Sequence, residues 1–265
     1  MKWKITCIQM DIQFGQPDLN FEHAKSLLHK YATDSDVLVL PELWTTGYDL
    51  TRLDEIGDHE AQRFQSEMSE TVAALQTHLV AGSTAAIRKN GITNSLYVYN
   101  KTGSKQLSYS KAHLFQLMNE HHYLISGEQD GLFMLDGTTC AGMICYDIRF
   151  PEWIRLHAVN GAKVIFVVAQ WPLARVDHWR SLLIARAIEN QCFVVACNRI
   201  GSDPDNTFAG HSMVINPWGD IIAEVDETSE ALTAEIDLTE INNVRKTIPI
   251  FEDRRPSLYE KLENK

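Results

Sequence analysis

The sequence predicts an α/β domain with a mixed sheet or with two sheets packed face to face. Three observations lead to this prediction: short runs rich in β-branched residues recur along the chain, amphipathic helical patterns lie between several of them, and turn signals separate others. The chain has 265 residues, 45% of them hydrophobic, which is enough for a sizeable core. No linker-like stretch or repeat divides it, so we expect a single domain over residues 1–265.

The expected strands are short apolar runs, whereas the expected helices carry apolar residues at spacings of three and four. We expect strands over residues 3–10, 37–40, 79–87, 95–99, 138–144, 164–169, 193–198, 211–216, 221–225 and 231–236, and helices over residues 20–32, 60–78, 152–160 and 178–190. Alternation of strand and helix favours parallel pairing, because a helix returns the chain across the sheet. Turn signals at residues 89–91, 101–103 and 217–220 add antiparallel hairpins.

The charge balance restricts the partners. Thirty-five acidic and 24 basic residues give a formal charge of -11, so we expect no nucleic acid and no anionic membrane surface as partner. No apolar run approaches the roughly 18 residues of a membrane span, and the N-terminus lacks the apolar core of a secretory signal. We therefore expect a cytoplasmic protein. An anionic substrate would need a local cation.

Five cysteines are too few, and odd in number, for a disulfide framework. We interpret Cys7, Cys140, Cys192 and Cys197 as small buried hydrophobic residues. Cys145 differs because an apolar strand ends at this residue and a helix begins near Pro151. A turn of this kind exposes a nucleophile and directs the following backbone N–H groups toward a developing oxyanion. The alternative for Cys145 is one more buried thiol.

Two further residues follow strand-like stretches and carry charges that catalysis could use. Glu42 comes directly after the apolar run 37–41, and active sites of α/β sheets gather beyond such strand ends, where a general base is useful. Lys111 is surrounded in sequence by aromatic and aliphatic residues, and its ammonium could stabilise developing negative charge. The alternatives are a solvent-facing glutamate and a surface lysine lying over apolar neighbours.

Other catalytic motifs are absent from the sequence. It contains no G-x-S-x-G, no G-x-G-x-x-G, no P-loop and no H-E-x-x-H, and its ten histidines show no zinc-site spacing. We therefore expect no metal and no cofactor.

Three segments together resemble the glutamate, lysine and cysteine signatures of the carbon-nitrogen hydrolase, or nitrilase, superfamily. They occur in the family's order and are Pro41-Glu42, Lys111-Ala112-His113-Leu114 and residues 144–152. The resemblance extends over residues 3–259. Segments 42–48, 111–121 and 169–172 are most similar to the ω-amidase branch, which includes 2-oxoglutaramate amidases linked to methionine salvage.

The resemblance implies a four-layer αββα sandwich with mixed sheets, and a homodimer of two such sandwiches. It also implies a second catalytic glutamate, which matches Glu120, although Glu128 lies nearby. The implied reaction is hydrolysis of the terminal amide of a small ketoacid or dicarboxylate monoamide to a carboxylate and ammonia, through a thioester on Cys145. Glu42 would be the proton acceptor, and Lys111 with the Tyr146 N–H would stabilise the oxyanion.

A substrate of this class has a carboxylate at the end distant from its amide, which calls for a cation or several donors. Our candidate is Arg149, for which an ion pair with Glu152 is the alternative. Further expected pocket residues, besides Tyr146, are Tyr48, Phe115, Gln170 and Trp171.

Two alternative functions remain open. One is another amidase of the same superfamily, acting on N-carbamoyl compounds or on a deaminated peptide amide, since the three signatures do not select the acyl group. The more distant one is a non-catalytic binding protein or redox sensor in which Cys145 is oxidised.

Overall fold

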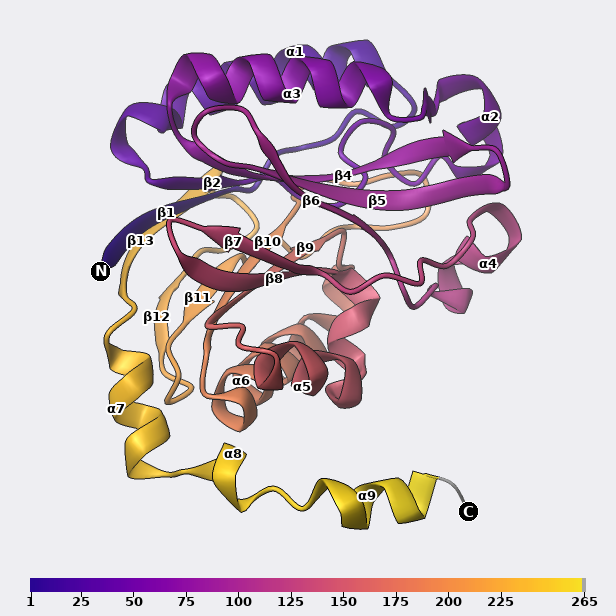
Figure 1. The fold of residues 1–265 in the computed structure, drawn as a ribbon. Helices are drawn as coiled ribbons and strands as arrows, with labels where there is room; N and C mark the ends of the chain where they lie inside the picture. Colours follow the sequence, from indigo (N-terminus) through magenta and orange to yellow (C-terminus); the bar gives the residue numbers. More distant parts are fainter. Residues whose placement is uncertain (264–265) are drawn as a thin grey trace.

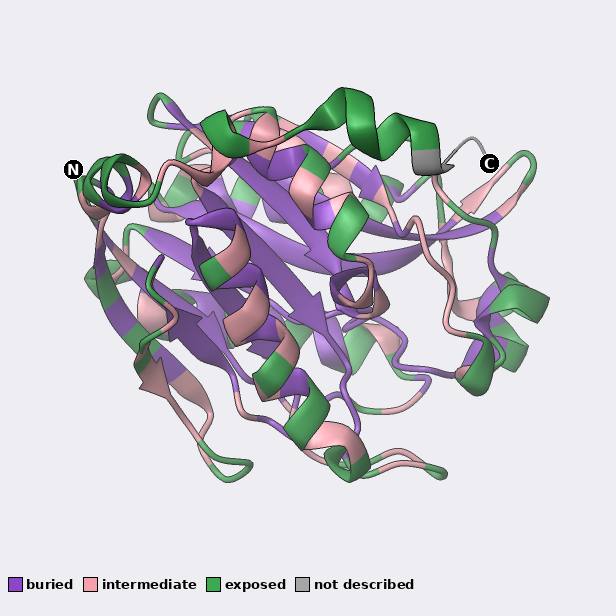
Figure 2. Cartoon of the chain, turned by 90° about the horizontal axis from the view of Figure 1, so that it is seen from below, coloured by how far each residue is buried: buried purple, intermediate pink, exposed green. Residues whose placement is uncertain are grey.

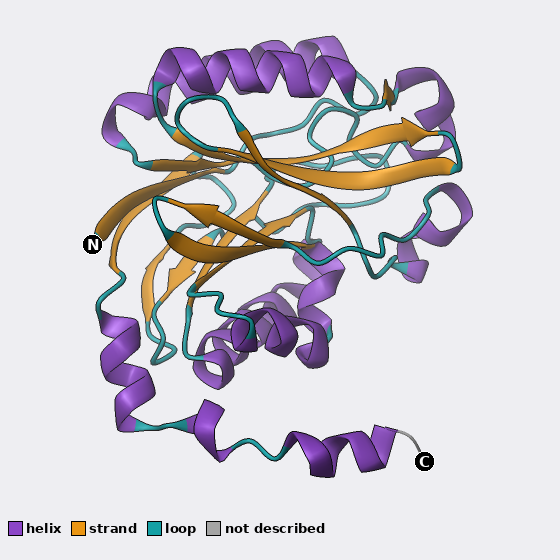
Figure 3. Cartoon of the chain, in the orientation of Figure 1, coloured by secondary structure: helices purple, strands orange, loops and turns teal. Residues whose placement is uncertain are grey.

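The computed structural model describes residues 1–263, which form two β-sheets packed face to face between two layers of helices (Figures 1 and 3). Helices α1 (Pro17–Tyr31) and α3 (Gln62–Leu75) cover one sheet, and α5 (Pro151–Val159) and α6 (Val176–Asn190) cover the other. The predicted four-layer αββα sandwich with mixed sheets is confirmed.

The first sheet has the strand order β13-β1-β2-β4-β5-β6, with β3 paired to β4. Its strands are β1 (Lys2–Ile8), β2 (Val37–Val39), β3 (Asp58–His59), β4 (His78–Arg88), β5 (Gly91–Tyr99), β6 (Lys105–Ser110) and β13 (Ala231–Asp237). Strands β1, β2 and β4 are parallel, because α1 and α3 return the chain to the same end. The hairpins β4–β5 and β5–β6 are antiparallel, as their turn signals predict.

The second sheet has the strand order β12-β11-β10-β9-β8-β7. Its strands are β7 (Leu132–Leu135), β8 (Thr138–Ile144), β9 (Val164–Ala169), β10 (Phe193–Asn198), β11 (Met213–Ile215) and β12 (Ile221–Glu224). Strands β8, β9 and β10 are parallel, with α5 and α6 as their crossovers. Because sheet and helices cover both faces of these central strands, all six residues of β9 and all six of β10 are buried (Figure 2).

The structure differs from the predicted elements in places where periodicity is short or weak. The helix expected to reach His78 ends at Leu75, because Gln76 takes a left-handed conformation, and His78 starts β4 instead. The two-residue β3, the four-residue β7 and several short helices were not expected. These helices are α2 (Leu53–Ile56), α4 (Glu120–Tyr123), α7 (Glu240–Thr247), α8 (Ile250–Asp253) and α9 (Pro256–Glu263). Most of them have too few turns to show an apolar period.

A bulge in β4 brings the segment after β2 against the sheet. The β4–β5 register shifts between Val80 and Ser83, and Gly82 within this bulge has a φ of +65°. The Ser83 hydroxyl accepts a hydrogen bond from the Leu43 N–H (2.8 Å), and the Ser83 N–H donates to the Pro41 carbonyl (3.2 Å). A Cβ at Gly82 would collide with that carbonyl oxygen. Glycine here therefore fixes the backbone on both sides of Glu42.

Replacing Gly82 by alanine should destabilise the protein by about 2–5 kcal/mol, since a left-handed backbone and a backbone collision add together. The matched control is Gly137→Ala, because Gly137 has a φ of +76° with no atom within 4 Å of an added Cβ. It should cost only about 1–2 kcal/mol. Urea denaturation measures both, and equal losses would contradict the role assigned to the bulge.

Candidate active site

Cys145 lies at the sharp turn that follows β8. Its φ is +44°, a left-handed conformation that is uncommon for a residue with a side chain, and it starts a 3₁₀ turn, Cys145–Arg149, that leads into α5. Strained backbone of this kind tends to occur at functional sites. The side chain is buried, so the turn presents its sulfur to the interior of a cavity.

The buried carboxylate of Asp147 holds this turn in place. One of its oxygens accepts from the Ile144 N–H (3.0 Å) and from the Tyr109 hydroxyl (2.7 Å). The other oxygen accepts from the His113 N–H (3.1 Å) and lies 2.8 Å from the His113 ring Nδ1. Because Tyr109 and His113 flank Lys111 in the chain, Asp147 couples the cysteine turn to the lysine segment.

Glu42 is fully buried and accepts hydrogen bonds from donors in both sheets. Its Oε1 accepts from Asn94 Nδ2 of β5 (2.8 Å), and its Oε2 accepts from the Gln170 N–H after β9 (2.9 Å). The Gln170 side chain also donates to the Glu42 carbonyl (2.8 Å). These bonds fix both carboxylate oxygens, and Glu42 lies close enough to Cys145 to raise the pKa of its thiol.

Lys111 lies between two carboxylates. Its ammonium donates to Glu42 Oε1 (2.9 Å) and to Glu120 Oε1 (2.6 Å), and all three side chains have no exposed surface. Glu120 Oε2 accepts from the Phe115 N–H (2.7 Å). The Tyr48 hydroxyl lies 2.6 Å from Glu120 and 3.0 Å from Glu42, so it bridges the same pair.

This burial changes the protonation equilibria of the cluster. Burial alone would lower the pKa of Lys111, but the carboxylates of Glu120 and Glu42 outweigh it and raise that pKa above the ordinary value. Burial raises the pKa of Glu120, although the Lys111 ammonium acts against it. Burial and the neighbouring Glu42 also raise the pKa of Cys145 well above that of a free cysteine. The resting cysteine is therefore a thiol beside a proton acceptor and a fixed cation.

A narrow cavity opens onto Cys145. It is lined by Phe115, Met118, Cys145, Tyr146, Arg149, Gln170, Trp171, Pro172 and Arg175. About 240 Å³ of this space is free of protein atoms, part of it open to solvent.

The structure brings most of the predicted site residues together. Glu42, Lys111 and Glu120 form the buried cluster beside Cys145, whereas Glu128 is exposed and lies outside it. Five of the expected pocket residues line the cavity, and these are Tyr146, Arg149, Phe115, Gln170 and Trp171. Tyr48 is not among the residues that line it, because its hydroxyl is directed to the two glutamates.

A family model described as carbon-nitrogen hydrolase matches residues 4–246. The chain belongs to the carbon-nitrogen hydrolase family. This carbon-nitrogen hydrolase is 54% identical to the 2-oxoglutaramate amidase of Bacillus subtilis (strain 168), over 98% of this chain and 100% of that protein. It is 32% identical to Omega-amidase YafV of Escherichia coli (strain K12), over 94% of this chain and 96% of that protein.

A solved structure supports the same family membership. A CN-hydrolase superfamily protein of Xanthomonas campestris, crystallised with an arsenic adduct in its active site, superposes with a TM-score of 0.90 at 29% identity. The superposition covers 96% of this hydrolase and 98% of that chain. The two proteins therefore share the sandwich over nearly their whole length.

The sequence analysis of this hydrolase did not identify Asn94 or Arg175. Asn94 lies in the polar run Thr93-Asn94-Ser95, within a strand whose other residues are mostly buried and apolar. Three polar residues in an otherwise apolar strand were the feature of the sequence that could have indicated a functional residue here. Arg175 closely follows the segment 169–172 that the sequence analysis used for the resemblance.

Within residues 1–263, no group of three or more His, Cys, Asp or Glu side chains is arranged to hold a metal ion. None of the helices in the same range combines the length and the apolar character that a membrane crossing requires.

Replacing Lys111 by methionine should destabilise the hydrolase by about 3–5 kcal/mol at pH 8, since two buried carboxylates lose their shared cation. The loss should be smaller at pH 5. The reason is that the pKa of Glu120 is raised in the folded protein. Its contribution to stability is present below the pKa that it has in the unfolded chain, and it is lost as the pH rises through the folded pKa. Urea denaturation at the two pH values measures the difference.

The control for this substitution is Lys105→Met, at the start of β6, the strand that precedes Lys111. Lys105 is exposed and donates to Gln65, so its replacement should change stability by about 0.5 kcal/mol or less at either pH. A loss in Lys111→Met that does not depend on pH would contradict the proposed role of its ammonium as counter-ion.

Proposed function

We propose that this chain is an ω-amidase that hydrolyses the terminal amide of a small ketoacid monoamide such as 2-oxoglutaramate. The observation that carries the proposal is the buried cluster of Glu42, Lys111 and Glu120 beside the Cys145 thiol, at a narrow cavity with arginines in its wall. The 54% identity to a 2-oxoglutaramate amidase along that protein's whole length supports the choice of substrate.

In the proposed first half-reaction, Glu42 accepts the thiol proton of Cys145 as the sulfur attacks the amide carbonyl carbon. The carbonyl π electrons move to oxygen, and a tetrahedral oxyanion forms. Lys111 and the Tyr146 N–H at the start of the 3₁₀ turn donate hydrogen bonds to that oxyanion. As the C–N bond breaks, Glu42 returns the proton to the departing nitrogen, which leaves as ammonia.

The second half-reaction releases the acid. Glu42 takes a proton from water, whose oxygen attacks the thioester carbonyl. As the C–S bond breaks to give the carboxylic acid, Glu42 returns this proton to the departing sulfur and the thiol is restored. Glu120 and Tyr48 act as positioning residues in this proposal, because Glu120 bonds to Lys111, Tyr48 bonds to both glutamates, and neither residue lines the Cys145 cavity.

The far end of the substrate requires a cation, and Arg149 remains our candidate. The alternative ion pair with Glu152 is not found: within residues 1–263, the Arg149 guanidinium lies over the Trp171 ring (4.8 Å) and its Nη2 is 3.3 Å from His178 Nδ1. Among the side chains of residues 1–261, no carboxylate forms an ion pair with Arg149. A guanidinium in the cavity wall that lacks an ion-pair partner supports a carboxylate clamp.

The structure disfavours the redox-sensor alternative. Sensor cysteines are accessible and have a lowered pKa, because the thiolate is the form that is oxidised. Cys145 is buried and has a raised pKa. The alternative of another amidase of the same family stays open, since the cysteine, lysine and glutamate do not select the acyl group.

We further propose a cytoplasmic protein without a nucleic-acid partner, as the charge of -11 and the buried free cysteines favour. The link to methionine salvage stays a prediction.

Cys145→Ala should remain folded and lose amidase activity completely, since no other group in the cavity can form the thioester. Ammonia release should be measured over 2-oxoglutaramate, 2-oxosuccinamate, succinamate, glutamine and N-carbamoyl amino acids. Intact-protein mass spectrometry during turnover should detect an acyl adduct on the unchanged protein and none on Cys145→Ala. Ammonia release by the folded variant would remove Cys145 from the mechanism.

The control is Cys140→Ala, because Cys140 is a buried cysteine on the strand that ends at Cys145. This variant should still form the adduct. A preference for N-carbamoyl compounds over ketoacid amides would favour the alternative amidase.

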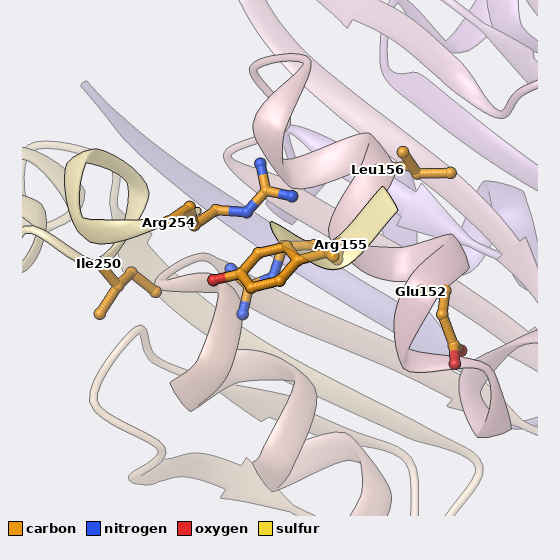
Figure 4. Close-up of a pocket in the computed structure, with 6 residues that line it drawn as sticks. Glu152, Arg155, Leu156, Ile250 and Arg254 are labelled. Atoms are coloured by element: carbon orange, nitrogen blue, oxygen red, sulfur yellow. The ribbon is translucent and has the colours of Figure 1, made fainter. Parts of the chain in front are cut away.

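We also propose that the protein is a homodimer. The outer face of α5, α6 and α9 exposes Leu156, Ile188, Leu258 and Tyr259, each at least 41% accessible. Between α5 and the C-terminal segment lies a second cavity, which shares no lining residue with the Cys145 cavity (Figure 4). Leu156 and Tyr259 line it, together with Arg155 and Arg254. A second copy over this face would bury these apolar side chains.

Leu156→Glu should shift the protein from dimer to monomer, because it puts a charge at the centre of the proposed contact. Light scattering after size exclusion measures the mass. Leu19→Glu is the control, since Leu19 is equally exposed (53%) but lies on α1, on the opposite side of the sandwich. A monomeric unchanged protein would refute the proposal.

A further inference from the structure

The cavity at Cys145 has a second guanidinium in its wall besides that of Arg149. Arg175 lies in a 3₁₀ turn, Leu173–Arg175, directly before α6, and lines the cavity together with Arg149. Its guanidinium is placed over the Phe115 ring, with 5.6 Å from Cζ to the ring centroid. Two arginines from different segments therefore border one small space.

The backbone holds Arg175 in this place. The carbonyl of Arg175 accepts a hydrogen bond from the Trp171 indole N–H (2.7 Å), and its N–H donates to the Pro172 carbonyl (3.1 Å). Trp171 also lies under the Arg149 guanidinium. The buried Trp171 side chain thus contacts both segments that carry these arginines, and it holds the two segments in place relative to each other.

The Arg175 side chain has no carboxylate partner. Among the side chains of residues 1–261, no ion pair or side-chain hydrogen bond of its guanidinium is found, and the guanidinium lies over the Phe115 ring. The protein as a whole has a formal charge of -11, so two guanidiniums without ion-pair partners give this cavity a local positive charge on an acidic protein. Two guanidiniums offer more donors than a single carboxylate uses.

We propose that Arg175 is a specificity-determining residue that, with Arg149, binds the acidic end of the substrate while the amide end lies at Cys145. This inference rests on the proposed amidase function and specifies the substrate class further. The preferred substrates are linear monoamides with a terminal carboxylate. A 2-oxo group beside that carboxylate adds a third acceptor oxygen, which the second arginine can bind.

The experiment compares two amides that differ only in the acidic group. Glutaramate has a terminal carboxylate, and valeramide has the same five-carbon chain without it. The kcat/KM for glutaramate divided by the kcat/KM for valeramide measures how strongly the protein recognises the carboxylate. Hydrolysis of 2-oxoglutaramate is measured alongside. The variants are Arg175→Gln, Arg149→Gln and the double variant, with circular dichroism to check folding.

Arg175→Gln should lower the glutaramate-to-valeramide ratio about 10- to 100-fold, through KM more than through kcat, because a charged hydrogen bond to the substrate is lost. If both arginines bind the same group, the double variant should lose less than the product of the two single losses. Arg175→Lys keeps the positive charge but lacks the planar guanidinium that can bind both oxygens of a carboxylate. This variant should therefore restore part of the glutaramate-to-valeramide ratio.

The control is Arg180→Gln. Arg180 lies on the adjoining helix α6 and pairs with Glu224 outside the cavity, so its replacement should leave the ratio unchanged. A second readout, inhibition by glutarate against any amide that is hydrolysed, should weaken in Arg175→Gln by a similar factor. This readout applies even if valeramide turnover is too slow to measure.

The outcomes separate the two proposals. If the unchanged protein does not hydrolyse 2-oxoglutaramate, the proposed substrate is wrong, but the ratio and the glutarate inhibition still test Arg175. If 2-oxoglutaramate is hydrolysed and Arg175→Gln changes neither the ratio nor the inhibition, the role of Arg175 is overturned. Arg175 would then only pack against Phe115.

Discussion

The site is built around one buried ammonium between two buried carboxylates. Removing three charges from water is costly, and the arrangement is stable only because every charge has close partners: Lys111 bonds to Glu42 and Glu120, and further donors complete both carboxylates. The same surroundings raise the pKa of Lys111 and that of Cys145, which favours a cationic lysine and a neutral thiol. Structure and proposed chemistry therefore depend on one set of contacts.

The two-sheet architecture is what allows this cluster to form. Glu42 follows β2 and Lys111 follows β6 in the first sheet, whereas Cys145 follows β8 and Gln170 follows β9 in the second. Face-to-face packing of the sheets places these strand ends beside one another. The Gly82 bulge then fixes the backbone around Glu42. The Asp147 carboxylate fixes the turn at Cys145 by hydrogen bonds to the Ile144 and His113 N–H groups.

Charges are arranged differently in the buried cluster and in the cavity wall. In the cluster, positive and negative charges are paired and hidden from solvent, which favours a reaction that creates and removes charge there. In the cavity wall, Arg149 and Arg175 have no ion-pair partners among the side chains of residues 1–261. An otherwise acidic protein thus presents local positive charge where an anionic substrate would bind.

The sequence by itself determined the alternation of strands and helices, the identities of Glu42, Lys111 and Cys145 as chemically distinctive residues, and the family, because these depend on local periodicity and short motifs. Only the tertiary structure decided between Glu120 and Glu128, directed Tyr48 to the glutamates, and brought Asn94 and Arg175 to the site. These side chains come from distant segments without a spacing that links them. The reason is physical: hydrogen bonds and ion pairs depend on distances in space, and those distances are set by how the two sheets pack.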